Sequence, residues 1–242
     1  MKKLSFLLFL PLLFTACQQE GDLDVNFKLE YDGSPIAMFQ RVDYPRGGEI
    51  FFDRVSVFIS DIAVKDTKGD WNGKSNVHFL EFSNLQDASQ AETGITASLE
   101  DVAAAKYEEL RMGIGLAPDW NATTPADYET NHPLSNNYWE AWNGYIFMII
   151  EGKADTDADG RADFSFSYHI GKDEAFSMWN AAKDFTIVED QVSTLNVTFD
   201  LKHILTNGTE SVDIETFQID HSSDPDLYDF LRGNFVNAFS IE

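Results

Sequence analysis

The sequence is almost without cysteine. Cys17 is the only one among the 242 residues, so the chain beyond it has no disulfide, no thiolate metal ligand and no cysteine nucleophile. A soft metal ion bound there would have to be held by histidine or methionine side chains.

Basic residues are also scarce. Lys and Arg number 17 against 41 Asp and Glu, which gives a formal net charge of −24. This imbalance argues against nucleic acid and anionic membrane surfaces as partners of the domain, and it favours cations. The acidic residues are spread along the chain, so many of them belong to a solvated surface.

Long apolar runs are absent except at the start of the chain. The run from Leu4 to Phe14 is too short to span a bilayer permanently. Two lysines precede it, and two small residues separate it from Cys17. Residues 1–16 are therefore typical of a bacterial lipoprotein signal peptide, with Cys17 as the lipidated residue. The alternative is an ordinary cleaved signal followed by an unmodified cysteine.

The next segment, residues 17–24, reads CQQEGDLD and is polar and acidic. We expect it to be a tether, and it resembles the signal by which some Gram-negative groups move lipoproteins to the cell surface. Lipid on Cys17 would anchor the chain without a spanning helix. The expected location is the outer membrane, on its periplasmic face or at the cell surface.

Common catalytic motifs are missing. The chain has no G-x-S-x-G elbow, no Walker loop, no dinucleotide-binding fingerprint and no H-E-x-x-H. We therefore expect a non-catalytic protein.

Alternation of apolar and polar residues dominates what is present. It indicates strands near residues 25–31, 50–64, 76–82, 107–116, 144–152, 163–170 and 193–201. Residues 25–242 are therefore predicted to form a single all-β domain, an antiparallel β-sandwich. Short helices are expected near 97–107 and 172–183, and a C-terminal one over 222–239 with Asp224 as N-cap and Pro225 in the first turn. Residues 117–137 are expected to form a long functional loop.

Residues 155–163 carry carboxylates at alternate positions. Asp155, Asp157 and Asp159 precede Gly160, which permits a sharp turn, and the Arg161 carbonyl and Asp163 follow. Such a loop can converge on a hard cation, and calcium accepts this irregular oxygen set. Phe166 stands where an EF-hand has its bidentate Glu, so the pattern indicates a shorter calcium loop between strands. The alternative is a solvated acidic hairpin turn.

The histidines are widely spaced. None of the five forms a close zinc-type pair, so any histidine site must be assembled from distant strands. They are His78, His132, His169, His203 and His221. In the strand 163–170, His169 is on the polar face, opposite the aromatic one.

Several segments together resemble the MbnP-like copper-binding family, whose members are found beside methanobactin genes and as lipoproteins. The matching pieces are VNFKLEYDGSPI, VSVFISDIAV, VHFLEF, YEELRMGIGL, HPLSNNYWEAWNGYIFMIIEG, FSYHIG and NFVNAFS. The resemblance implies a β-sandwich with a mononuclear copper site built from histidines. In some members it also implies a tryptophan oxidised to kynurenine by a di-haem cytochrome c peroxidase-like partner.

Carried onto this chain, the resemblance implies His169 as the first copper ligand, His78 as the second and His132 as the third. Trp139 and Trp142 are the candidates for oxidation, although Ala141 stands where the family pattern W-x-W has its second tryptophan.

Three functions follow as hypotheses. The first is a copper-binding envelope lipoprotein for capture, storage or delivery, with calcium stiffening the 155–163 hairpin. The second is a calcium-stabilised surface interaction or adhesion module without copper, in which Trp120, Tyr128 and Trp139 stack on a partner. The third is a protein whose main role is to be a haem enzyme's substrate. A meeting of His78 and His169 in space would favour copper, whereas histidines on opposite sheets or ends would favour the interaction module.

Overall fold

The computed structural model describes residues 19–74 and 76–242. The predicted signal peptide and Cys17 lie outside these residues. No helix in the described part is long and apolar enough to cross a membrane.

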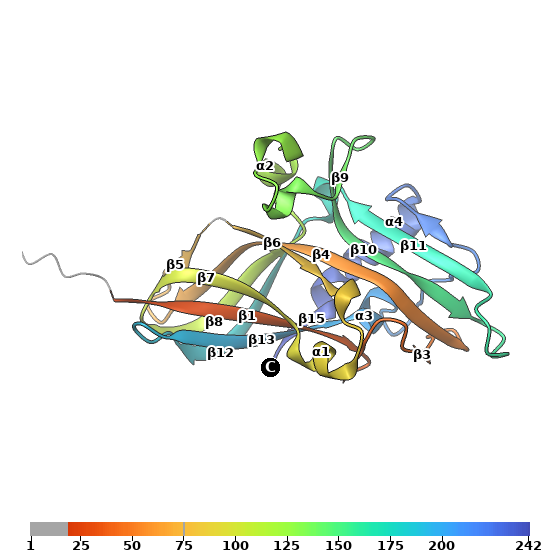
Figure 1. Cartoon of the computed structure of the whole chain (residues 1–242), viewed down its shortest axis with the longest axis horizontal. Coiled ribbons are helices and arrows are strands. Elements are labelled where there is room, and N and C mark those ends of the chain that lie inside the picture. Colours follow the sequence, from red (N-terminus) through yellow and green to blue (C-terminus); the bar gives the residue numbers. More distant parts are fainter. Residues whose placement is uncertain (1–18, 75) are drawn as a thin grey trace, which may run out of the picture.

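Two sheets form the described part of the chain (Figure 1). The smaller sheet runs in the order β15 (Phe239–Ile241), β13 (Val192–Asp200), β1 (Glu20–Tyr31) and β2 (Ser34–Pro35), with β7 (Ile95–Ala103) also paired to β1. The larger sheet runs β12 (Ser177–Thr186), β8 (Lys106–Ile114), β4 (Glu49–Asp66), β10 (Gly144–Asp155), β11 (Phe164–Gly171) and β14 (Ile219–Asp220). Short strands β3 (Val42–Asp43), β5 (Trp71–Gly73), β6 (Val77–Glu81) and β9 (Tyr138–Trp139) flank it.

Helical pieces are short. The α-helices are α1 (Ala88–Thr93), α2 (Pro118–Asn121), α3 (Leu201–Leu205) and α4 (Pro225–Asn234). The 3-10 turns are η1 (Phe82–Asn84), η2 (Pro125–Asp127), η3 (Pro133–Ser135), η4 (Asp173–Ala175) and η5 (Phe235–Ala238). The predicted all-β class is confirmed. The predicted C-terminal helix is confirmed as α4, and the Asp224 side chain caps it by accepting the backbone N–H groups of Asp226 and Leu227.

Alternating burial explains the strands. In β1, Leu23, Val25, Phe27 and Leu29 are all fully buried and face the space between the sheets. The 18-residue β4 is buried on both faces through its middle. Its outer face is covered in part by an aromatic cluster, in which the Phe58 ring lies 6.0 Å from that of Tyr145.

Three expectations differ from the structure. Two strand pairs are parallel, β1 with β13 and β11 with β14, so the sheets are mixed rather than antiparallel throughout. The helix predicted over 97–107 is strand, since Ala97, Leu99 and Val102 are buried against β1 and pairing overrides the helix-forming alanines. The helix predicted over 172–183 is replaced by η4 and β12, because β12 pairs along β8.

Part of the segment predicted as a tether, residues 17–24, belongs to the folded domain. Strand β1 already begins at Glu20, because Gly21 and Leu23 continue the buried alternation and the strand pairs with both β7 and β13 there. The loop predicted over 117–137 is confirmed as a long connection, and it carries α2, η2 and η3.

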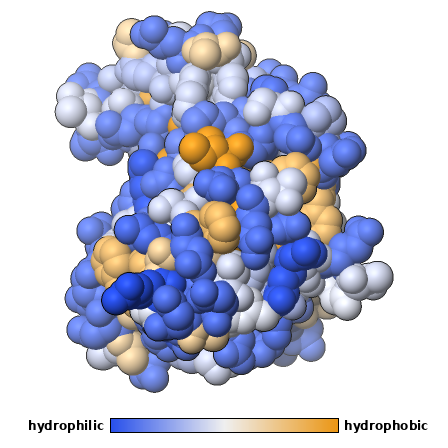
Figure 2. Space-filling view, turned by 90° about the vertical axis from the view of Figure 1, so that its right-hand side faces the viewer, coloured by the Kyte–Doolittle hydropathy of each residue, from blue (hydrophilic) through white to orange (hydrophobic). Residues whose placement is uncertain are grey.

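The surface agrees with the composition. Seen from the right-hand side of Figure 1, it is mostly hydrophilic with small scattered apolar patches (Figure 2).

Candidate metal centre

His169 lies on β11, next to the central strand β10. The register pairs it with Ile149, and Glu151 projects from the same face two residues further along β10. The Nε2 atom of His169 is 2.7 Å from Oε1 of Glu151. Ser167 donates its hydroxyl to the same carboxylate oxygen at 3.0 Å.

The protonation of this pair follows from its surroundings. Burial lowers the pKa of His169, and this outweighs the hydrogen bond to Glu151, which acts in the opposite direction. Burial raises the pKa of Glu151, but hydrogen bonds from His169 and Ser167 outweigh it and lower that pKa overall. At neutral pH, Glu151 is therefore an ionised acceptor and His169 is neutral.

This state leaves one imidazole nitrogen free. A carboxylate only accepts hydrogen bonds, so Nε2 of His169 carries the hydrogen and Nδ1 carries the lone pair. Nδ1 of His169 is buried and has no hydrogen-bond partner among the described residues. Histidines that bind metals usually donate one ring N–H to a carboxylate or carbonyl and bind the metal through the lone pair of the other nitrogen.

The second imidazole at this place is His221. Strand β14 runs parallel to β11 and pairs Ser167 with Ile219 and Tyr168 with Asp220. The next position brings the rings of His221 and His169 together, with centroids 4.6 Å apart and planes at 13°. Sequence reasoning missed His221 because only this parallel register connects two histidines so distant along the chain.

Ser222 fastens the segment carrying His221 to β11. Its hydroxyl donates to the carbonyl of His169 at 3.0 Å and accepts the backbone N–H of Gly171 at 3.2 Å. Its own carbonyl accepts a hydrogen bond of 2.6 Å from Nζ of Lys172. Both Ser222 and Lys172 have left-handed backbones, at φ 51° and 69°, a conformation that non-glycine residues adopt only when the surroundings enforce it.

Trp139 lies against both imidazoles. Its ring centroid is 5.4 Å from that of His169 and 4.8 Å from that of His221. Trp142 stacks on Trp139, with centroids 5.1 Å apart and planes at 14°. A tight turn between β9 and β10 places the two indoles together, since the N–H of Trp142 donates to the carbonyl of Trp139 at 3.0 Å.

The other two predicted copper ligands do not join this cluster. Strands β10 and β4 separate β11 from β6, which carries His78. His78 pairs with Ile59 on β4, whereas His169 is aligned through Ile149 with Ser56, three residues earlier. Side chains alternate between faces, so His78 and His169 project from opposite sides of the sheet. The expected meeting of these two residues does not occur.

His132 has a local role. Its Nδ1 accepts the backbone N–H of Leu134 at 3.1 Å. Its ring stacks on that of Tyr128 at 4.1 Å. Trp120, which the interaction hypothesis placed with Tyr128 and Trp139, is half-buried and donates its indole N–H to Asp61 at 3.3 Å.

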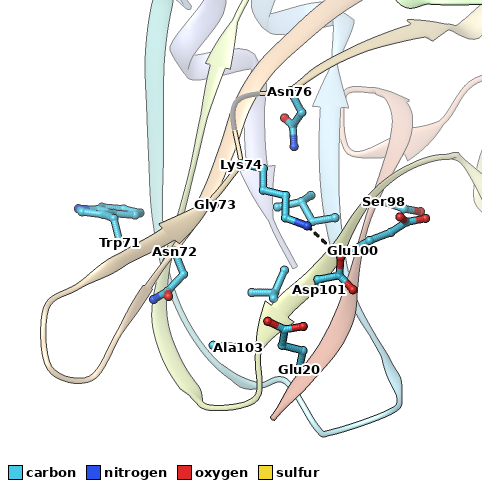
Figure 3. Close-up of a pocket in the computed structure, with 12 residues that line it drawn as sticks. Glu20, Trp71, Asn72, Gly73, Lys74, Asn76, Ser98, Glu100, Asp101 and Ala103 are labelled. Carbon is cyan, nitrogen blue, oxygen red and sulfur yellow. Dashed lines mark hydrogen bonds and ion pairs between the residues drawn. The ribbon is translucent and has the colours of Figure 1, made fainter. Parts of the chain in front are cut away.

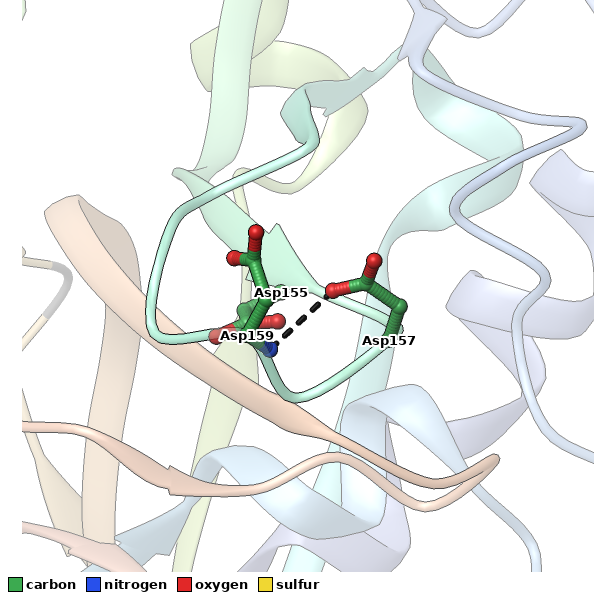
Figure 4. Close-up of side chains that lie close together, drawn as sticks. All are labelled: Asp155, Asp157 and Asp159. Atoms are coloured by element: carbon green, nitrogen blue, oxygen red, sulfur yellow. Dashed lines mark hydrogen bonds between the residues drawn. The ribbon is translucent and has the colours of Figure 1, made fainter.

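Three of the predicted calcium ligands gather at the turn after β10. Carboxylate oxygens of Asp155, Asp157 and Asp159 lie within 4.8 Å of one another (Figure 4). Asp155 is only 2% exposed. Its Oδ1 is buried and has no hydrogen-bond partner among the described residues. Its Oδ2 accepts from the N–H of Gly160 at 2.9 Å and from Arg41 at 3.2 Å.

The remaining two predicted calcium ligands are not among the three converging carboxylates. The carboxylate of Asp163 accepts the backbone N–H of Thr156 at 2.9 Å. Arg161 donates its backbone N–H to Asp159 at 2.8 Å.

A separate polar cleft of about 480 Å³ opens between β5 and β7. Lys74 reaches across it to Asp101 at 3.1 Å (Figure 3). Neither His169 nor His221 lines this cleft, so it is distinct from the histidine cluster.

Comparisons with known proteins support one family. The MbnP family model matches residues 20–222. Among solved structures, the chain is similar to MbnP from Methylosinus trichosporium, with a TM-score of 0.59 and 16% sequence identity over 91% of this chain and 97% of that chain. At this identity the structural match shows a shared fold. The curated proteins searched gave no match.

Proposed function

This chain belongs to the MbnP family, and from this premise we propose that it is a non-catalytic copper-binding protein of the cell envelope, serving copper capture, storage or delivery. His169 and His221 would hold a single copper ion. The observation that carries the proposal is the unpartnered, buried Nδ1 of His169 beside the stacked ring of His221. In this proposal His221 is the second copper ligand, the role for which the sequence had suggested His78 and His132.

The donor set fits copper. In a chain whose only cysteine is Cys17, imidazole nitrogen is the natural ligand for this metal. Glu151 supports His169 from behind, which orients the ring and increases the basicity of its open nitrogen. Copper would be carried by this protein as cargo, and the residues of the site would bind it and shield it from water.

Trp139 is the preferred candidate for oxidation. It touches both imidazoles, whereas Trp142 reaches them only through Trp139. Kynurenine at position 139 would place an aryl amine next to the two histidines. A di-haem cytochrome c peroxidase-like partner would supply the oxidant, and lipid on Cys17 would hold the chain at the outer membrane, on its periplasmic face or at the cell surface.

The 155–163 turn is proposed as a structural calcium site with fewer side-chain ligands than the sequence indicated. Asp155, Asp157 and Asp159 would bind the ion, and the unpartnered Oδ1 of Asp155 favours this over a merely solvated turn. Arg41 already neutralises the other oxygen of Asp155, so calcium and Arg41 would share this carboxylate.

Elemental analysis tests the proposal. The mature chain from Gln18 onward would be exposed to copper and calcium, dialysed extensively and analysed for both metals. We expect one copper ion per chain in the wild type and in His78→Ala, which is the matched histidine control, and loss of copper in His169→Ala and His221→Ala. Calcium retained without copper would contradict the copper proposal and leave the calcium-stabilised interaction module.

A further inference from the structure

We propose that Lys172 directs one-electron oxidation of the stacked tryptophan pair to Trp139 rather than Trp142. This makes Lys172 a specificity-determining residue that touches neither imidazole. The inference rests on the proposed function for its biological purpose, but its physical basis is the charge arrangement around the two indoles.

The two indoles form one redox unit. Their rings stack at 5.1 Å with planes at 14°, so an electron passes between them faster than either radical reacts with oxygen or water. The site of lasting modification is then set by the relative stability of the two indole radical cations, and not by which ring meets the oxidant first.

A fixed cation lies on the Trp142 side of this unit. Nζ of Lys172 is 5.8 Å from the centroid of the Trp142 ring and 5.8 Å from that of Tyr228. The hydrogen bond to the Ser222 carbonyl holds the ammonium there. An ammonium attracts a neutral indole but repels an indole radical cation by Coulomb's law.

The acidic neighbours of Lys172 do not cancel its repulsion of a radical cation on Trp142. Asp173 and Glu174 line the same hollow as Trp142 and Lys172, and both side chains belong to exposed residues, where water screens them. Asp173 is also turned toward Asn121, whose amide donates to it at 2.8 Å.

The Trp139 side has no cation directly against its ring. Its two ring neighbours are His169 and His221. The carboxylate of Glu151 lies behind His169 at 2.7 Å, and it neutralises Arg54, which is 3.9 Å from its other oxygen. No Lys or Arg within the described residues lies over the Trp139 ring. A positive charge on the pair is therefore more stable on Trp139.

The oxidation of the pair is a one-electron transfer followed by loss of a proton. An external outer-sphere one-electron oxidant takes one electron from the pair and is itself reduced by one electron. If Trp142 is oxidised first, an electron from Trp139 refills it and the positive charge moves to Trp139. The indole N–H proton of Trp139 then passes to water, which leaves a neutral radical at position 139.

The test uses the copper-free mature chain and photogenerated tris(bipyridine)ruthenium(III) as the oxidant, with products at each tryptophan mapped by peptide mass spectrometry. In the wild type, modification should occur mainly at Trp139. In Lys172→Gln the ratio of Trp139 to Trp142 products should fall by roughly fivefold or more, as expected for removing a unit charge at this distance. Lys172→Met, which also keeps the alkyl stem, should behave in the same way.

Two controls separate charge from packing. Lys172→Arg keeps the cation and should retain the wild-type ratio, and Lys183→Gln removes an equal charge from β12 and should also retain it. Modification mainly at Trp142 in the wild type would overturn the proposal, and so would an unchanged ratio in a folded Lys172→Gln variant. Because no copper is present, the copper-retention assay can fail while this test succeeds, and the reverse also holds.

Discussion

At the scale of single residues, Ser222 joins a strained backbone to the proposed copper site. Its hydroxyl joins His169 and Gly171 of β11 to the segment that carries His221, while its backbone is left-handed. Ser222→Ala should lower the free energy of unfolding by about 1–2 kcal/mol and weaken copper binding by roughly tenfold, through a displaced His221. Urea unfolding of the apo-protein and a copper-chelator competition would measure the two effects.

Ser222→Gly separates the effect of the missing hydroxyl from the effect of the strained backbone. Glycine adopts the left-handed conformation freely, so its stability should recover relative to Ser222→Ala, while its copper affinity stays reduced because the hydroxyl is still missing. Wild-type copper affinity in both variants would show that the hydroxyl does not position His221.

His78 is a buried histidine outside the proposed copper site. Its Nε2 is buried without a hydrogen-bond partner among the described residues, and burial lowers its pKa. With a folded-state pKa below the unfolded one, the unfolded chain binds more protons. Stability is therefore complete above the unfolded value near 6.5 and falls as pH drops below it.

His78→Leu should raise the free energy of unfolding at neutral pH, because a buried unpaired nitrogen is removed. The substitution should also make the loss of stability between pH 7 and pH 5 smaller than in the wild type. Copper retention should not change. Urea midpoints at both pH values would measure this. A stability loss at pH 7 would mean that water or an undetected partner satisfies the ring.

At the scale of elements, the end of β11 is packed against the turn between β9 and β10. A Cβ on Gly171 would come within 2.6 Å of the Tyr145 carbonyl and 2.7 Å of the Trp142 ring. Gly171→Ala should therefore cost about 1–3 kcal/mol and alter the near-UV circular dichroism of the stacked indoles. Gly233→Ala in α4 is the matched control, since no atom of the described residues lies within 4 Å of a Cβ there, and it should stabilise the helix by up to about 1 kcal/mol. Equal effects of the two substitutions would contradict this packing.

The same element shows how far the sequence predicts the site. Alternation placed His169 on the polar face of its strand, and the spacing of Asp155, Asp157 and Asp159 predicted their convergence, because both depend on local geometry. The pairing of β14 with β11 is parallel and non-local, so the place of His221 could not be read from spacing. Strand pairing likewise decided residues 97–107, where local propensity alone favoured a helix.

At the scale of the whole molecule, the net charge of −24 means that the stability of the fold should depend on cations, both those bound at a site and those in the surrounding solution. Added NaCl should raise the melting temperature by screening repulsion among the carboxylates. Calcium at matched ionic strength should raise it further, because an ion that binds only the folded chain stabilises it by mass action.

The acidic turn allows the bound and diffuse effects to be separated. Asp157→Asn should abolish the additional calcium effect while leaving the NaCl effect unchanged, with Asp184→Asn on β12 as the control of equal charge. Arg41→Gln should instead increase the calcium effect, because it releases Oδ2 of Asp155 from its ion pair and removes a competing cation. Differential scanning calorimetry in calcium and in NaCl would give these shifts. If Arg41→Gln behaved like Asp157→Asn, then Arg41 would be the cation that orders this turn, and the calcium proposal would have to be withdrawn.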